Sequence, residues 1–140
     1  MTDTALSGGC LCGVVRFSAR LNSREVGACH CGMCRRWTAG PFLALECATL
    51  TLDDPSQVVA YRSSEWAERI FCKSCGSSLF YRLIPRDLYF VSAEAFDDQT
   101  GFVLKTEGFI DEKPAHYTFA DATRQLTGAE VFAAYTQPDE

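Results

Sequence analysis

The sequence lacks a long apolar run, and its first segment, Met1–Ser7, contains neither basic residues nor an apolar core. A secretory signal peptide needs both features, and a membrane-spanning helix needs about 20 apolar residues. Basic residues are also scarce, since 13 Lys and Arg stand against 18 Asp and Glu, for a formal net charge of −5. These absences argue against a membrane role and against general nucleic-acid binding, and they predict a cytoplasmic protein.

No linker, low-complexity run or domain-sized repeat divides the 140 residues. That length suits one domain, which buries roughly two thirds of the surface that its unfolded chain exposes. We therefore expect residues 1–140 to form a single domain with a hydrophobic core of its own.

Cysteine is the residue type that the sequence uses in clusters. Seven of the eight cysteines stand in C-x-C or C-x-x-C spacings. In a reducing compartment such clusters indicate metal binding before disulfides. Free buried thiols would account for one or two cysteines, but not for seven in these spacings.

Two of the clusters are pairs, Cys10-x-Cys12 and Cys72-x-x-Cys75. An extended backbone places Cys10 and Cys12 on one face, and a C-x-x-C turn likewise brings two sulfurs together. Two such pairs make a four-thiolate structural zinc site. Such a site would join the N-terminal strand to the middle of the domain and offset much of the entropy of closing that loop.

The third cluster places Cys29, Cys31 and Cys34 within six residues, without an obvious partner pair. Catalytic zinc is usually held by three protein ligands with a fourth position open. We therefore expect a catalytic zinc here, and two zinc ions per chain. The remaining Cys47 lies in an apolar run and is expected to be a small buried hydrophobe. The alternative, Cys47 as a fourth ligand, would close the site.

Two histidines and two arginines are further candidates for a functional role. His30 alternates with two ligands, so it should point away from the metal and lie behind the ligands or at the surface. A lone His116 beside an aromatic residue is more often a packing residue than a ligand. Arg35 and Arg36 follow the last thiolate directly, where cations would suit a carboxylate-bearing substrate.

The remaining pattern predicts short strands and little helix. Strands are expected at 14–19, 25–29, 42–47, 50–52, 58–62, 69–71 and 88–92, with a mixed strand region at 102–110. One helical turn is expected at 35–39, and a short helix at 127–135. The fold class is therefore mainly β, with short antiparallel strands and the cysteines in the turns.

Three linked motifs, GGCLCGVVRF at 8–17, CHCGMCRR at 29–36 and FCKSCGS at 71–77, carry a resemblance to a known family. With the Lys113-Pro114 pair, the sequence resembles the glutathione-dependent formaldehyde-activating enzyme family, also called the CENP-V/GFA family, over about residues 7–120. The resemblance implies an Mss4-like, zinc-bound β-tent, with a structural zinc on Cys10, Cys12, Cys72 and Cys75. It also implies a catalytic zinc on Cys29, Cys31 and Cys34.

The activity that the resemblance implies is carbon–sulfur lyase chemistry on an adduct of glutathione and formaldehyde. Family members usually carry tryptophan where this chain has His116. Two other classes of function compete with a lyase acting on a small thiol adduct. One is a non-catalytic binding module for a protein or nucleic acid, and the other is a zinc or redox buffer. The three-ligand cluster favours the enzyme, and the acidic composition disfavours nucleic acid.

Overall fold

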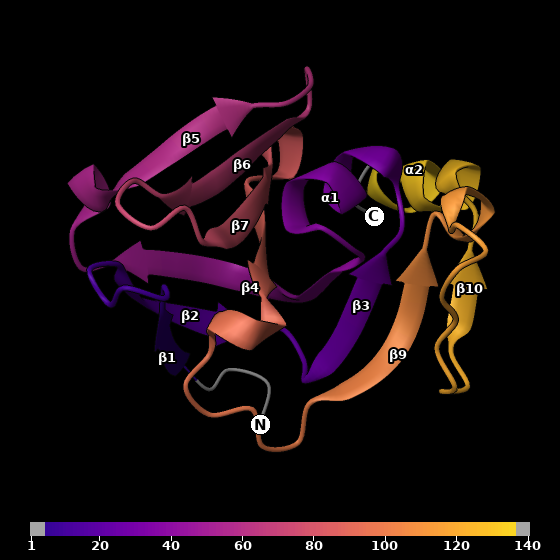
Figure 1. Cartoon of the computed structure of the whole chain (residues 1–140), viewed down its shortest axis with the longest axis horizontal. Coiled ribbons are helices and arrows are strands. Elements are labelled where there is room, and N and C mark those ends of the chain that lie inside the picture. The colour runs from indigo at the N-terminus through magenta and orange to yellow at the C-terminus, as the bar shows by residue number, and fades with distance from the viewer. Residues whose placement is uncertain (1–4, 137–140) are drawn as a thin grey trace. The chain divides into compact units, whose positions relative to one another are not determined.

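The computed structural model describes residues 5–136, which contain ten strands and two α-helices (Figure 1). The strands are β1 (Ala5–Gly9), β2 (Arg16–Leu21), β3 (Glu25–Cys29), β4 (Phe42–Leu52), β5 (Val58–Arg62), β6 (Ala67–Cys72), β7 (Ser78–Leu83), β8 (Leu88–Ser92), β9 (Val103–Gly108) and β10 (Arg124–Leu126). The helices are α1 (Gly32–Thr38) and α2 (Gly128–Thr136). Four 3₁₀ turns complete the description: η1 (Pro55–Gln57), η2 (Ile84–Arg86), η3 (Ala93–Ala95) and η4 (Ile110–Glu112). The protein is therefore mainly β, as predicted.

The strands fall into two compact units. The first unit contains residues 5–24 and 44–102, in which β1, β2, β4, β8, β7, β6 and β5 pair in that order, each pair antiparallel. Its core is aromatic: the Phe17 ring packs edge-on against Phe80 and Phe96, with ring centroids 5.0 and 5.5 Å apart. Phe17, Ala19 and Leu21 are all buried because side chains alternate along β2.

The second unit contains residues 25–43 and 103–136. Here β3 and β9 run parallel, side by side in Figure 1, and β10 pairs parallel with β9. The expectation of antiparallel strands therefore fails in this unit, and β10 was not predicted. Both differences have the same cause. The strands that pair with β9 are distant from it in the sequence, and no local residue pattern predicts such pairing.

The boundaries of β4 and α1 differ most from the predictions; β2 and β6 differ by one or two residues at each end, and β1 and β7 were not predicted as strands. The strands expected at 42–47 and 50–52 form the single strand β4, in which Leu21 pairs with Cys47 and Arg20 with Thr49, so that Ala48 is an extra, bulged residue. A bulge continues a strand while shifting its side-chain pattern, which explains the interrupted periodicity. Helix α1 begins at Gly32, so Cys34 lies in a helix and not in a loop. Within residues 5–136, no helix is long and apolar enough to cross a lipid bilayer.

Candidate metal centres

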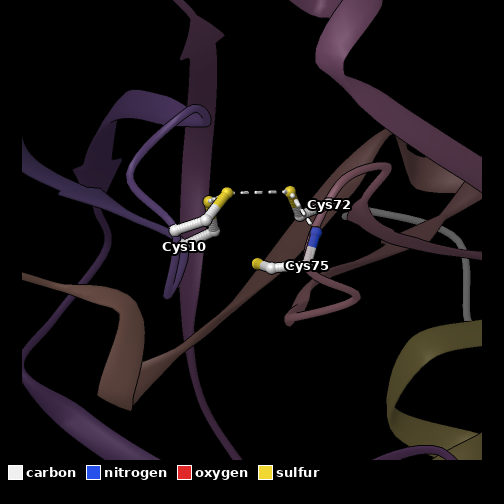
Figure 2. Close-up of side chains that lie close together, drawn as sticks. Cys10, Cys72 and Cys75 are labelled. Atoms are coloured by element: carbon white, nitrogen blue, oxygen red, sulfur yellow. Dashed lines mark hydrogen bonds between the residues drawn. The ribbon is translucent and has the colours of Figure 1, made fainter.

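The first cysteine cluster lies in the first unit and brings four sulfurs together. The Sγ atoms of Cys10, Cys12, Cys72 and Cys75 all lie within 4.8 Å of one another. Cys12 Sγ is 3.6 Å from Cys10 Sγ and 3.9 Å from Cys72 Sγ. Figure 2 shows the labelled Cys10 side chain facing Cys72 and Cys75 across the cluster. Tetrahedral bonds of about 2.3 Å to one ion place sulfur atoms about 3.8 Å apart, so this spacing fits a tetrahedral metal–thiolate site.

Two tight turns present these sulfurs and direct backbone N–H groups at them. Gly13 and Gly76 have φ of 84° and 80°, which glycine adopts without a steric penalty. The Val15 amide donates to Cys10 Sγ, and the Ser74 and Cys75 amides both donate to Cys72 Sγ, each at 3.3 Å. Such N–H donors stabilise thiolate charge, as metal ligation requires.

The electrostatics of the first cluster also suit a cation. Hydrogen bonds from the Ser77 hydroxyl and amide lower the pKa of Cys75 to about 5. The Val14 amide lowers the pKa of Cys12, but burial and the neighbouring sulfurs outweigh it and raise that pKa to about 11. Thiolates this close repel one another, and a divalent cation among them removes the conflict.

The second cluster lies in the second unit and contains Cys29, Cys31 and Cys34, whose sulfurs also lie within 4.8 Å of one another. Cys29 ends β3, Cys31 is the N-cap of α1, and Cys34 lies in its first turn. Cys31 Sγ accepts a hydrogen bond from the Cys34 amide at 3.3 Å. The adjoining sulfurs of Cys31 and Cys34 strongly raise the pKa of Cys29, so this cluster too favours a cation.

Among residues 5–136, no fourth Cys, His, Asp or Glu side chain joins this second cluster. Cys47 belongs to neither cluster; it is fully buried, its Sγ donates to the Leu45 carbonyl at 3.5 Å, and burial raises its pKa to about 12. His116 is exposed, and its ring and the neighbouring Tyr117 ring form a T-shaped contact with centroids 5.4 Å apart. The two cysteine clusters therefore offer four and three sulfur ligands.

His30 is fully buried, and both of its ring nitrogens have partners. Its Nε2 lies 2.8 Å from Glu107 Oε1, and its Nδ1 lies 2.8 Å from the Tyr117 hydroxyl. Of the two positions expected for His30, behind the ligands or at the surface, the surface is excluded.

The two arginines after Cys34 differ in their surroundings. Arg35 is half-buried, and its Nε donates to the His30 carbonyl at 2.8 Å. This bond holds the guanidinium beside the segment that carries the three-sulfur cluster. Arg36 is exposed.

Sequence reasoning missed the residues that enclose His30. Glu107 is 2% exposed, and its second oxygen accepts from Thr123 Oγ1 at 2.6 Å. Burial raises the pKa of Glu107, but hydrogen bonds from Thr123 and His30 outweigh it and hold that pKa below its usual value. The sequence offered one signal. Glu107 is the only acidic residue of the segment 105–108, which belongs to a predicted strand region and in which Thr106 and Gly108 are uncharged.

A sequence model described as "Glutathione-dependent formaldehyde-activating enzyme" matches residues 5–112. The chain belongs to this family. The resemblance carried by the three cysteine motifs is thereby confirmed.

A sequence relative supports family membership, and a solved structure shares the fold. The chain is 35% identical over 126 residues to a protein of Schizosaccharomyces pombe described as an uncharacterized lyase, and the match covers 89% of this chain and 92% of that protein. The family and this relative together identify the chain as an enzyme of the lyase class. Its fold is similar to that of a Rhodobacter sphaeroides protein of known crystal structure, with a TM-score of 0.58 and 21% identity over 66% of this chain and 88% of that one.

Proposed function

We propose that the protein is a zinc-dependent carbon–sulfur lyase that forms and splits the hemithioacetal of a small thiol and formaldehyde. The leading candidate substrate is S-hydroxymethylglutathione. The observation that carries the proposal is that Cys29, Cys31 and Cys34 form a three-sulfur cluster, whereas a separate cluster offers a full set of four sulfurs. Three protein ligands leave one position for a substrate, whereas four close a structural site.

The cysteines divide the metal roles in this proposal. Cys10, Cys12, Cys72 and Cys75 hold a structural zinc, and Cys29, Cys31 and Cys34 hold a catalytic zinc, two ions per chain. When bound at the three-sulfur cluster, zinc supplies stabilisation of a thiolate at neutral pH. In cleavage the C–S bond breaks, and its electron pair goes to sulfur. The hydroxyl oxygen loses its proton as the carbonyl of formaldehyde forms. The thiolate that is released then takes up a proton to give the free thiol.

Arg35 and Arg36 supply the charge that an anionic thiol needs. Glutathione carries two carboxylates and one ammonium group, so it arrives as a net anion at a protein of formal charge −5. Local cations must therefore favour the encounter. Arg35, fixed by its bond to the His30 carbonyl, and the exposed Arg36 follow the last ligand and can pair with the carboxylates.

The wider setting follows from the same residues. We propose that residues 1–140 act as one zinc-binding domain and that the protein works in the cytoplasm, where a reducing environment keeps its thiols available for metal. A small-molecule thiol is its partner. The acidic composition does not favour nucleic acid.

A metal-content and activity assay tests the function. Purified protein should contain two zinc ions per chain and should accelerate exchange between glutathione plus formaldehyde and their adduct, followed by NMR. Chelation should abolish the acceleration, and Cys31→Ser should match the chelated protein. Two zinc ions with no acceleration would overturn the lyase and support a non-catalytic binding module instead.

A further inference from the structure

An open space above Gly32 is bounded by two opposite charges. Gly32 stands between Cys31 and Cys34 of the three-sulfur cluster and follows Cys31 directly, so its amide lies close to the Cys31 sulfur. A Cβ atom at position 32 would lie 3.8 Å from Arg35 Nη2 and 3.9 Å from Glu112 Oε1. Among residues 5–136, the chain neighbours and the helix backbone aside, no further atom comes within 4 Å of that point. A cation and an anion thus line the same space beside the sulfurs.

Both charges are fixed to the main chain on either side of Cys31. Glu112 Oε1 accepts a hydrogen bond from the Gly32 amide at 2.9 Å. Arg35 Nε donates to the His30 carbonyl at 2.8 Å. In the described part of the chain the two charges form no ion pair with each other. They therefore stand side by side, each with capacity left for a ligand.

Glu112 keeps its negative charge available to a ligand. Its side chain is exposed, and its second carboxylate oxygen has no hydrogen-bond partner within residues 5–136. The next residue, Lys113, does not neutralise it, because its ammonium group donates to the carbonyls of Pro114 and Tyr117. A carboxylate accepts hydrogen bonds at both oxygens, so Glu112 has room for a cationic donor from a bound molecule.

We propose that Arg35 and Glu112 together bind the α-amino-acid head of the substrate thiol, Arg35 its carboxylate and Glu112 its ammonium group. An α-amino acid carries these two charges on one carbon atom, so it fits a cation and an anion that line one space. Glutathione has such a head at its γ-glutamyl end, and free cysteine is another source of it. The assignment rests on the proposed binding of a thiol at the three-sulfur cluster, and it adds the ammonium recognition that arginines do not supply.

The same arrangement discriminates against thiols that lack the ammonium group. Such a thiol brings only carboxylates, and Glu112 repels any carboxylate that enters the space above Gly32. Specificity of this kind combines an attractive contact for the right ligand with a repulsive one for the wrong ligand. Glu112 is therefore a specificity determinant for a zwitterionic thiol.

The test compares two matched pairs of thiols on zinc-loaded, full-length protein. One pair is glutathione and glutaryl-cysteinylglycine, which lacks only the amino group, and the other is cysteine and 3-mercaptopropionate. Dissociation constants are measured by calorimetry for wild type, Glu112→Gln and the control Glu65→Gln, which changes an exposed glutamate of the first unit. Glutamine keeps an oxygen for the Gly32 amide while it removes the charge. Zinc content and circular dichroism are recorded for each protein.

Wild type should bind the ammonium-bearing thiol of at least one pair roughly three- to tenfold more tightly, as one hydrogen-bonded contact implies. Glu112→Gln should lose this discrimination, and Glu65→Gln should retain it. The pair in which discrimination is lost shows whether the recognised head belongs to glutathione or to cysteine. Equal binding within both pairs by wild type, or unchanged discrimination in Glu112→Gln, would overturn the assignment.

The exchange assay separates this inference from the proposed lyase function. A wild type that accelerates exchange but does not discriminate within either pair keeps the lyase function and loses the ammonium site. A wild type that discriminates through Glu112 but accelerates no exchange keeps the ammonium site, as part of a thiol-binding protein, and loses the lyase function. Failure to bind any of the four thiols would overturn both.

Discussion

His30 Nε2 lies 2.8 Å from Glu107 Oε1, although 77 positions separate the two residues in the chain. The parallel pairing of β3 with β9 produces this contact, because it sets Ala28 opposite Glu107 and Cys29 opposite Gly108. The strand that ends at Cys29, the first cysteine of the three-sulfur cluster, is thereby joined to a buried carboxylate. The site is built on two strands and a helix start and not on one loop alone.

The four-sulfur cluster should be essential for folding. Cys72→Ser or Cys75→Ser should give poorly soluble or unfolded protein, because structural zinc contributes about 10–16 kcal/mol of apparent binding free energy that is also folding free energy. Soluble yield, thermal unfolding and zinc content measure this. Ser74→Ala, an exposed neighbour in the same turn, is the matched control and should resemble wild type. A Cys72→Ser protein with wild-type stability and full zinc would refute the four-thiolate site.

The three-sulfur cluster should be separable from the fold. Cys31→Ser should lower zinc from two ions to one and abolish thiol–aldehyde activity, while the circular dichroism spectrum stays close to wild type. Cys31 is the N-cap of α1, and serine is a favourable N-cap residue, so the helix should persist. Retention of two zinc ions and full turnover would contradict the catalytic role of this cluster.

The arginines should matter only for anionic thiols. Arg35→Ala or Arg36→Ala should raise the apparent KM for glutathione by roughly ten- to a hundredfold, since a charge-assisted hydrogen bond contributes about 1.5–3 kcal/mol. Zinc content should not change, and a neutral thiol such as mercaptoethanol should be nearly unaffected. Steady-state kinetics with both thiols test this prediction. An equal increase in the apparent KM for glutathione and for mercaptoethanol would argue against carboxylate recognition.

Glu107 should give the protein a measurable acid sensitivity. Its pKa is lowered in the folded state, so it stabilises the fold above its unfolded pKa of about 4.3, and this contribution disappears as pH falls through the lower folded value. Glu107→Gln should therefore cost about 1–3 kcal/mol at pH 7, as for an incompletely paired buried group. Urea unfolding of both proteins between pH 7 and pH 3 should show the difference shrinking below about pH 4. A difference independent of pH would exclude the carboxylate as its source.

Cys47 should be chemically silent in the folded protein. It is fully buried, and burial raises its pKa to about 12, so almost no thiolate is present or accessible near pH 8. Alkylation of zinc-loaded protein with iodoacetamide, followed by peptide mass spectrometry, should leave Cys47 unmodified, whereas denaturation with chelator should expose all eight cysteines. Rapid native alkylation of Cys47 would show that its strand opens.

The sequence by itself determined the family, the mainly β composition and the division of seven cysteines into two clusters. The motifs behind these predictions are local: Cys29, Cys31 and Cys34 span six positions, and the turns at Gly13 and Gly76 involve only neighbouring residues. Only the tertiary structure decided what surrounds His30. Glu107 and Tyr117 reach His30 through parallel strand pairing and the segment after β9, and Thr123 in turn donates to Glu107. Partners 77 and 87 positions away from His30 leave no periodic trace in a sequence. The alternation of side chains along an extended segment predicts that His30 points away from the metal. The burial of His30 and its carboxylate partner depend on tertiary packing, which involves the whole unit.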